Sequence, residues 1–525
     1  MHRRATLTRL SRWAAALALG SLFGSSPHRP PLQKPVAPRF GDDPFRLGVA
    51  SGCPRPSSVV LWTRLAPAPY EPGGGLAPRP VAVRWELAHD EHFAQRVQTG
   101  EVWAQPQHAH SVHVQVTGLD SDRRYFFRFI AGGVASGVGR TRTAPREDAA
   151  VQRLRIALAS CQHYEQGRFA VHREIAWRDL DFVLFVGDYL YESFHPHFQV
   201  RLHEGPPPTR LDAFRRRHAT YKLDPDLRAA HAAHPWVLTW DDHEVENDYA
   251  SDRSWLGGDP QSFLRRRAAA YKAYFEHLPI APDMAPTGAF MRIHDRYTWG
   301  RLAELWTLDP RQFRSVQACS LGRPVGGGRV LIDCDEMDDE RRTIFGAAQE
   351  QWLQEGLPGS TRTWKLLGQG SQISSWGVDT PFGRSVHSDS WDGYPQARER
   401  LLRGIADAQV HNVIALGGDV HRHVAAHLRL RPNDDETPIV ASEFVTSSIT
   451  TRGMPGAAMA LIRSANPDLL HARGDERGYA LVELRPDVAR CEFRATAFPV
   501  TEAAQLHTQA VYAVERDRAG VQREA

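Results

Sequence analysis

The chain has 525 residues, of which 42% are hydrophobic and 24% are charged, and these proportions are ordinary for a globular protein. They exclude a disordered chain, a collagen-like repeat and a coiled coil. Lys and Arg exceed Asp and Glu by only 64 − 61 = +3, which argues against nucleic acid as the main partner because phosphate binding requires a concentrated basic surface.

The first residues have the composition of an export signal. Arg3 and Arg4 are paired, and a short apolar run over residues 13–23 follows them. This run is shorter than the about 20 residues that a membrane-spanning helix needs. We therefore expect residues 1–26 to be a signal, with the twin-arginine route favoured over a general secretory signal, and the mature protein to be periplasmic or secreted.

Short β-prone runs, separated by Gly, Pro and Asp, occupy residues 45–145. Residues 81–87 and 112–116 alternate apolar and polar side chains, as half-buried strands do. This pattern predicts an all-β domain of the immunoglobulin or fibronectin type, and residues 117–120 with Tyr125 resemble its tyrosine corner. No chemically reactive residues converge here, so we expect a packing or positioning domain.

Beyond residue 150, apolar runs end in side chains that can bind a metal. Such near-continuous runs predict strands buried on both faces. Helical patterns over residues 263–278 and 348–357 lie between them, which predicts a layered α/β domain over residues 150–505. Four runs end at the groups Ser160-Cys161-Gln162, Asp188 to Glu192, Asp241 to Glu244, and Asp419 to His423, and a fifth ends at Gly368 to Gln372.

Each of these groups taken alone has an ordinary explanation. An Asp-Asp-His sequence is commonly a turn or a helix cap, Cys161 could be a small buried hydrophobic residue, and His421 a hydrogen-bonded core histidine. In α/β sheets, however, sites form at the carboxyl ends of the strands. Four groups that meet at one edge therefore predict a metal centre.

The types of donor suit two different ions. Asp188 follows a glycine, so its carboxylate can approach and bridge two cations, and Tyr191 can bind as a phenolate. Cys161 as a thiolate and His421 as an imidazole favour iron beside them. Asp242 and Asp419 offer only oxygen, which suits Ca²⁺ or Mg²⁺.

Two adjacent cations suit an in-line displacement at phosphorus by a bound hydroxide. His243 follows Asp242 directly, so its imidazole is placed to stabilise or protonate the leaving alkoxide. The residues therefore predict a hydrolase of phosphate esters.

With these motifs assembled, the chain resembles the PhoD-type alkaline phosphatases and phosphodiesterases, a branch of the calcineurin-like metallophosphatases. The resemblance extends over almost the whole mature chain. It is carried by the runs FRLGVASG (45–52), LWTRL (61–65), ASCQ (159–162), GDYLYE (187–192), WDDHEVEN (240–247), RQFR (311–314), QEQWL (349–353) and GDVH (418–421).

The resemblance implies a four-layer metallophosphatase β-sandwich flanked by helices after the N-terminal β-domain. It implies a secreted enzyme that hydrolyses phosphate mono- and diesters by attack of a metal-bound hydroxide. Fe³⁺ would be held by Cys161, Asp188, Tyr191 and His421, and Ca²⁺ would lie near Asp188, Asp242 and Asp419. The catalytic residues would be His243, which faces the leaving group, Asp188, and Asn247, which lies near calcium or phosphate.

The sequence departs from the family pattern in two places. Cys53 stands where Asp is usual, and Asp309-Pro310-Arg311 replaces Asp-Thr-Arg, which puts a substrate role for Arg311 in doubt. Gln369 or Gln372 could supply the missing contact, and the sequence does not choose between them.

The chain has five cysteines. Cys319 and Cys334 enclose a short Gly- and Pro-containing loop and are the preferred disulfide, a closure worth about 3 kcal/mol in the chain-entropy model. Two free thiols are the alternative, because a periplasm permits pairing without requiring it. Cys53 and Cys491 stay unassigned.

Two other functions stay open. One is a phospholipase D-like phosphodiesterase on the same site, with phospholipid or nucleotide substrates. The other is a secreted binding protein in which the metal is structural. For the enzyme we expect small phosphate ester substrates, a monomer, and no stable nucleic-acid or membrane partner.

Overall fold

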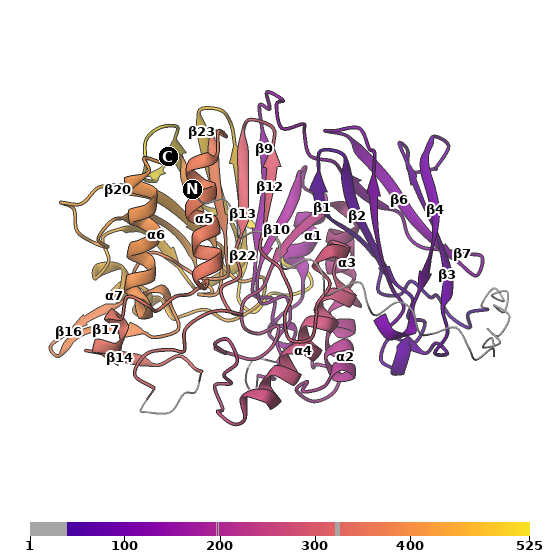
Figure 1. Ribbon diagram of the computed structural model, residues 1–525, viewed down its shortest axis with the longest axis horizontal. Helices are drawn as coiled ribbons and strands as arrows, with labels where there is room; N and C mark the ends of the chain where they lie inside the picture. The colour runs from indigo at the N-terminus through magenta and orange to yellow at the C-terminus, as the bar shows by residue number, and fades with distance from the viewer. Residues whose placement is uncertain (1–38, 196, 198, 321–325, 525) are drawn as a thin grey trace, which may run out of the picture. The chain divides into compact units, whose positions relative to one another are not determined.

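The computed structural model describes residues 39–195, 197, 199–320 and 326–524. The predicted export signal, residues 1–26, lies outside these ranges. Four sheets and seven α-helices form the described chain (Figure 1), which confirms the mixed α/β class. Among the described residues, no helix combines the length and apolar character needed to cross a membrane.

The largest sheet has ten strands in the order β25-β24-β23-β22-β9-β10-β11-β1-β2-β5. Its middle strands β9, β10, β11 and β1 are parallel neighbours. The bounds are β25 Gln522–Arg523, β24 His507–Glu515, β23 Val488–Ala497, β22 Glu476–Leu484, β9 Leu154–Ala159, β10 Phe182–Val186, β11 Pro235–Thr239, β1 Val49–Arg55, β2 Ser58–Arg64 and β5 Ser111–Thr117.

This sheet runs across the predicted boundary between residues 145 and 150. β1 pairs in parallel with β11, with Ser51 opposite Pro235. Every residue of β1 except Arg55 is buried, as is all of β2, so these strands have the burial of central strands rather than of a half-exposed sandwich sheet. The predicted N-terminal domain therefore shares one of its sheets with the rest of the chain.

The second sheet of the N-terminal region has five strands. They are β4 (Arg96–Ala104), β3 (Val81–Ala88), β6 (Arg124–Ala131), β7 (Val134–Ala135) and β8 (Gly139–Arg142). Val83 and Phe127 of this sheet pack with Val59 and Val114 of β2 and β5 in one core. The Tyr125 hydroxyl donates to the Asp120 carbonyl at 3.4 Å, the local contact that the sequence suggested.

A seven-stranded sheet has the order β12-β13-β15-β18-β20-β19-β21, and its strands β13, β15, β18 and β20 are parallel. The bounds are β12 Asp295–Trp299, β13 Ala303–Thr307, β15 Trp364–Gly368, β18 Val413–Gly417, β20 Ile439–Val445, β19 His423–Arg429 and β21 Leu469–Arg473. A small sheet joins β14 (Val330–Ile332), β17 (Gly383–His387) and β16 (Val378–Thr380).

The helices are α1 Ala170–Trp177, α2 Leu211–Lys222, α3 Pro225–Ala233, α4 Pro260–His277, α5 Ala347–Gly359, α6 Pro395–Asp407 and α7 Gly456–Ser464. The two predicted helical patterns fall in α4 and α5. α4 begins after Asp259, whose carboxylate accepts from the Gln261 and Ser262 amides, and a proline occupies its first turn. This is the usual chemistry of a helix start.

Two cores explain how the large sheets are held. The larger core contains side chains of α1 to α4 together with strands of both sheets, for example Leu184 of β10 and Leu305 of β13. A second core packs α5 and α6 on the seven-stranded sheet through residues such as Leu353 and Leu402. α5 and α6 run side by side along that sheet (Figure 1).

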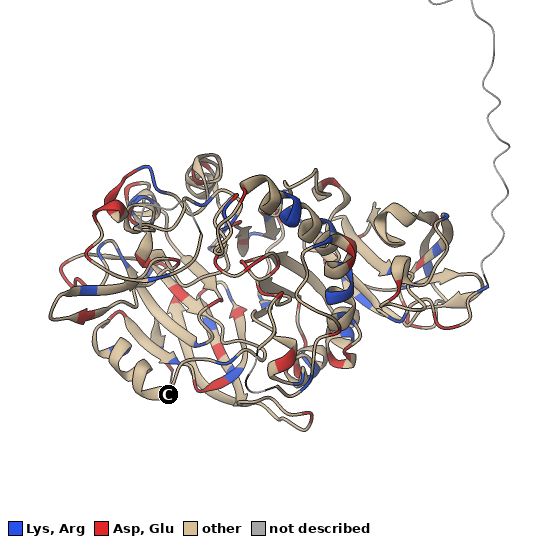
Figure 2. Cartoon of the chain, turned by 90° about the horizontal axis from the view of Figure 1, so that it is seen from below, with Lys and Arg blue, Asp and Glu red and all other residues tan. Residues whose placement is uncertain are grey.

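This arrangement places the predicted polar groups at the edges of two sheets rather than one. Cys161, Asp188 and Asp242 follow β9, β10 and β11 of the ten-stranded sheet, whereas Asp419 and His421 follow β18 of the seven-stranded sheet. Figure 2 views the molecule from below, and Lys and Arg are interspersed there with Asp and Glu.

Candidate active site

The residues at these strand ends have an uncommon backbone conformation. Cys161, Asp188, Asp419 and His421 have φ values of 58°, 56°, 65° and 52°. A side chain in this left-handed region costs about 1–3 kcal/mol, and such residues concentrate at functional sites. The chain bends sharply at each of them, which turns the side chains toward one another.

Two glycines permit the close approach of the strand ends. A Cβ atom on Gly187 would lie 2.5 Å from the Asp241 amide nitrogen, and one on Gly418 would lie 2.7 Å from the Ser160 hydroxyl. The second contact joins the two large sheets. Glycine before Asp188 and Asp419 is therefore a packing requirement as well as a sequence motif.

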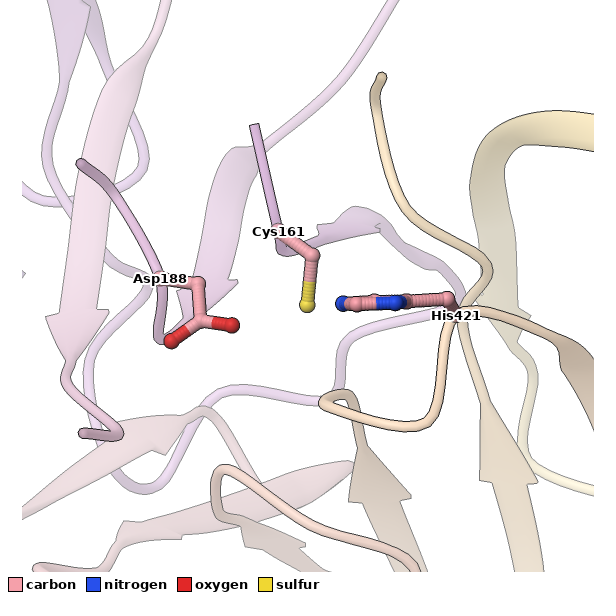
Figure 3. Close-up of side chains that lie close together, drawn as sticks. All are labelled: Cys161, Asp188 and His421. Carbon is pink, nitrogen blue, oxygen red and sulfur yellow. The ribbon is translucent and has the colours of Figure 1, made fainter. Parts of the chain in front are cut away.

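Cys161, Asp188 and His421 form the first group of donor atoms. One donor atom of each lies within 4.8 Å of the others, and Figure 3 shows the thiol between the carboxylate and the imidazole. The Tyr191 hydroxyl donates to Asp188 Oδ2 at 2.9 Å and lies 3.1 Å from His421 Nε2. The structure thus brings together all four side chains predicted to hold iron.

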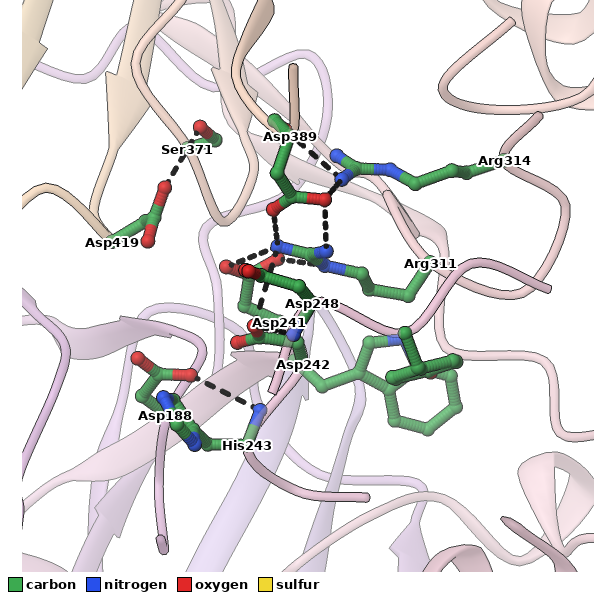
Figure 4. A network of polar contacts seen from close by, with 12 residues as sticks. Asp188, Asp241, Asp242, His243, Asp248, Arg311, Arg314, Ser371, Asp389 and Asp419 are labelled. Carbon is green, nitrogen blue, oxygen red and sulfur yellow. Dashed lines mark hydrogen bonds and ion pairs between the residues drawn. The ribbon is translucent and has the colours of Figure 1, made fainter. Parts of the chain in front are cut away.

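Asp188 also belongs to a second group, with Asp242 and His243, and Asp242 belongs to a third, with Asp248 and Asp389. Figure 4 shows the second and third groups with the arginines beside them. Asp188 is thus shared by two neighbouring groups of side chains that could hold a cation.

Asp419 belongs to none of these three groups of His, Cys, Asp and Glu, and Asn247 is considered with it as a predicted site residue. Asp419 Oδ2 accepts a hydrogen bond from the Ser371 hydroxyl at 3.1 Å, and Asp419 lines the same pocket as His421. Asn247 is fixed through its backbone amide, which donates to Glu192 Oε1 at 2.9 Å. Their roles at a metal or a phosphate stay predictions.

The electrostatics of the first group fit a bound cation. Burial, together with the Asp242 carboxylate, raises the pKa of Asp188 well above its usual range. Burial and then the Asp188 carboxylate raise the pKa of the Cys161 thiol. Because a nearby positive charge is what deprotonates such groups, a thiolate and a carboxylate at this position fit a bound metal ion.

The imidazole of the group is already in the form that binds metals. Burial lowers the pKa of His421 to about 3, so the ring is neutral at ordinary pH. Its Nδ1 lies 2.9 Å from the Arg452 carbonyl, which leaves Nε2 facing Tyr191. A neutral imidazole held through its second nitrogen is the usual state of a ligating histidine.

The side chain of Arg311 contacts buried carboxylates of the protein itself. It is fully buried, and its Nε donates to Asp241 Oδ1 at 2.6 Å while its Nη1 donates to Asp389 Oδ1 at 3.0 Å. Its Nη2 lies 3.7 Å from Asp242 Oδ2. The guanidinium therefore compensates the negative charge of these carboxylates.

The three carboxyl groups of the third group have pKa values shifted in opposite directions. Although burial opposes it, Arg311 holds the pKa of Asp389 and that of Asp242 below their usual range. Burial, followed by the Asp389 carboxylate, raises the pKa of Asp248 to about 8. The Gly328 amide donates to Asp248 Oδ2 at 2.9 Å.

His243 carries the opposite shift from His421. Burial would lower the pKa of its imidazole, but the carboxylates of Glu192, Asp242 and Asp188 raise it well above the usual value. The closest of these contacts joins His243 Nδ1 to Glu192 Oε2 at 2.7 Å. The imidazole is therefore held by Glu192 beside the carboxylates of Asp188 and Asp242.

Neither glutamine of the fifth strand end joins the donor groups. Gln369 hydrogen-bonds within its own turn, where its Oε1 accepts from the Ser371 amide. Gln372 Oε1 accepts from Arg422 at 2.8 Å.

Sequence reasoning missed several residues of the site. Asp248 lies one residue beyond the WDDHEVEN motif, which was a usable signal. Asp389 lies in a loop after a polar strand, and Thr451 lies six residues beyond the end of β20 rather than directly after it. Thr451 nevertheless donates to the Tyr191 hydroxyl at 3.0 Å.

The cysteines follow the preferred assignment. Cys319 and Cys334 form a disulfide, so that prediction is confirmed. Cys53, Cys161 and Cys491 are free and buried.

A pocket of about 330 Å³ opens beside the donor groups. Asp419 and His421 line it together with Asp389, and Trp376 and His387 stand at its wall. Its volume is at the small end of the range for ligand sites. A layered α/β protein with such a pocket beside clustered carboxylates, a thiol and imidazoles is typical of cation-dependent hydrolases.

The comparisons with known proteins give the particular family. Residues 156–493 match the PhoD-like phosphatase family, and residues 31–145 match the N-terminal domain of PhoD-like phosphatases. Alkaline phosphatase D of Bacillus subtilis (strain 168) is 40% identical over 496 residues, which cover 93% of this chain and 84% of that protein. The chain therefore belongs to the PhoD-like phosphatase family.

A solved structure supports the same conclusion. The match to "Structure of PhoD" has a TM-score of 0.89 and 39% identity, and it covers 93% of this chain and 94% of that chain. The resemblance seen in the sequence is confirmed, and so is the enzyme class, a phosphoric ester hydrolase. This membership does not support the alternative of a binding protein with a structural metal.

Proposed function

We propose that the protein is an exported, metal-dependent phosphatase and phosphodiesterase that holds Fe³⁺ and Ca²⁺. The observation that carries the proposal is the position of Asp188 in two donor groups, one with Cys161 and His421 and one with Asp242 and His243. Fe³⁺ would be held by Cys161, Asp188, Tyr191 and His421, and Ca²⁺ by Asp188 and Asp242, with Asp419 and Asn247 nearby.

Three residues of the chain would act beside the cations, each with a separate role. When bound, the two cations supply Lewis-acid stabilisation of phosphoryl charge and an activated nucleophile. His243 would give a proton to the leaving oxygen, and Asn247 would orient the phosphoryl group. Arg311 would keep Asp241 and Asp389 ionised and fixed beneath these residues, because it pairs with both.

The finer architecture and the localisation belong to the same proposal. The two cores favour four layers, with helices outside two facing sheets, and a β-sandwich of immunoglobulin type at residues 45–145. The paired Arg3 and Arg4 favour export by the twin-arginine route. A phospholipase D-like specificity on the same site stays a prediction from the resemblance.

The test is hydrolysis of p-nitrophenyl phosphate and of bis(p-nitrophenyl) phosphate by the purified protein, before and after chelation. We expect both esters to be cleaved, activity to fall on chelation, and added Ca²⁺ to restore part of it, because Asp242 and its neighbours are oxygen donors. Full activity after exhaustive removal of metal would contradict the proposal.

A further inference from the structure

The small sheet of β14, β17 and β16, at the lower left of Figure 1, has one face without charge. Residues directly opposite each other in an antiparallel pair share a face. The register pairs Val330 with His387, and it pairs Ser385 with both Ile332 and Val378. We call the face that these five side chains share the outer face. None of the residues of the three strands on this face is Asp, Glu, Lys or Arg.

The opposite face of the small sheet carries the charged residues and contacts the rest of the protein. Asp379 pairs there with Arg384, whose Nη2 donates to the Ser375 hydroxyl at 3.1 Å. On the outer face, by contrast, Val330 is 72% exposed and Ile332 is 39% exposed. Apolar side chains that lie open together, with polar residues around them, are typical of a binding surface.

The outer face continues into the candidate active site. His387 lines the pocket of about 330 Å³ beside the donor groups, and its ring stacks with Trp376 of the same pocket, with centroids 5.9 Å apart. A Cβ atom on Gly328 would lie 2.2 Å from His387 Cε1 and 2.9 Å from Asp248 Oδ2. The outer face therefore begins beside a carboxylate of the third donor group.

Apolar contacts join the same two regions a second time. Val378 of the outer face packs against a small core to which Trp376, Val420 and Met454 of the pocket also pack. The pocket and the outer face thus form one surface, polar at the donor groups and apolar along the sheet. A ligand that matches this surface has a phosphoryl group joined to an apolar organic group.

We propose that the outer face is a subsite for the apolar organic group of a phosphodiester, an inference that rests on the proposed function. One ester group of the substrate is an alkyl chain, which lies on Val330 and Ile332 while the phosphoryl group occupies the pocket. Loss of apolar surface from water drives this contact, and full burial of one CH₂ group is worth about fourfold in affinity. The contact is present before and during the reaction, so it lowers KM and leaves kcat unchanged.

The test uses the methyl, butyl and octyl diesters of p-nitrophenyl phosphate, at concentrations at which all three are monomeric. The leaving group is the same in each, so only the alkyl chain differs. We expect KM to fall by about twofold for each CH₂ group between methyl and butyl, because a chain on an open face is covered on one side only. KM should fall further for octyl, at constant kcat.

The double variant Val330→Ser, Ile332→Ser removes the apolar side chains of β14. It should make KM nearly independent of chain length and leave kcat on the methyl diester and the thermal midpoint unchanged, because both residues are open to solvent. Should this variant fold poorly, Val330→Thr with Ile332→Thr keeps the branched shape and should weaken the dependence on chain length. Val134→Ser is the matched control, since Val134 of β7 is also exposed, at 37%, and it should keep the full dependence.

Three results would overturn the subsite and leave the proposed function intact. One is a KM that does not change with chain length in the unchanged enzyme, and another is the same change in the double serine variant. The third is binding to phosphatidylcholine vesicles, or self-association in sedimentation, that the double variant abolishes while KM stays flat, because the outer face would then serve a membrane or a second copy. Failure to cleave any of the three diesters would instead contradict the proposed function.

Discussion

On one side of the site, Cys161, Asp188 and His421 lie against one another, and burial shifts their pKa values toward the neutral forms. On the other side, the Arg311 guanidinium lies between Asp241 and Asp389 and keeps the pKa of Asp389 low. Charge on the second side is compensated within the protein. We propose that charge on the first side is compensated by a bound cation.

This difference suggests that the two sides depend on bound metal to different degrees. The residues around Arg311 can hold their positions before a metal binds, because Asp241 and Asp389 are already paired with the guanidinium. A side with uncompensated donors gains most from the metal, since binding and deprotonation are coupled there. Asp188 belongs to the first side and shares a donor group with Asp242 of the second, so it is the residue through which the two sides would act together.

Asp188→Asn gives the largest expected effect on this comparison. The amide cannot supply a bridging charge, so activity should fall by more than about 100-fold, the scale found even for outer partners of metal ligands. Bound metal should fall with it, as measured by elemental analysis. The matched control is Asp181→Asn, a buried aspartate just before β10 that pairs with Arg142, which should change activity only a few-fold. A fully active Asp188→Asn enzyme would refute the bridging role.

Arg311→Met tests the compensated side. Removing the guanidinium leaves Asp241 buried without its ion-pair partner and Asp389 with Arg314 alone, which should cost about 3–5 kcal/mol in the free energy of unfolding. Urea unfolding would measure this loss. Arg403→Met removes an exposed helix partner of Glu399 and should leave the free energy of unfolding nearly unchanged. Similar losses of unfolding free energy in the two variants would show that the buried Arg311 ion pairs stabilise the fold no more than an exposed pair does.

The smallest expected effect at neutral pH comes from an imidazole that lies in none of the donor groups. Burial, followed by the positive charges of Lys222 and Arg64, lowers the pKa of His218 from 6.5 to about 3. Because the folded pKa is depressed, the neutral ring contributes stability that is complete above pH 6.5 and is lost as pH falls toward 3.

His218→Phe should therefore make the protein less sensitive to acid. The variant loses one proton-binding site of the unfolded chain, so the fall in unfolding free energy below pH 6.5 should lessen by about 1.4 kcal/mol per pH unit. Urea midpoints at a series of pH values would measure the slope. An unchanged slope would mean that His218 binds its proton in the folded state.

The strand ends were predictable because the chemistry is local there. Apolar runs marked β9, β10, β11 and β18, and the polar residues directly after them include Cys161, Asp188 and His421. The geometry of parallel strands then brings those residues to the sheet edges. The left-handed backbone and the glycines before Asp188 and Asp419 belong to the same short segments.

The rest depends on contacts between distant loops. The pairing of β1 with β11 brings residues near 50 beside residues near 235, which no local pattern encodes. Asp389 joins the site through Arg311, 78 residues away, and Thr451 reaches Tyr191 across 260 residues. Asp419 was predicted from its motif, yet its carboxylate lies in none of the three donor groups and accepts from the Ser371 hydroxyl.

The most direct test of the account is metal analysis combined with a visible spectrum of the purified enzyme and of Tyr191→Phe. The account predicts about one iron per chain and an absorption band from a tyrosinate bound to Fe³⁺, since the Tyr191 hydroxyl lies beside Asp188 and His421. The band should disappear in Tyr191→Phe while Cys161 and Asp188 still bind iron. An active enzyme that is colourless and free of iron would contradict it.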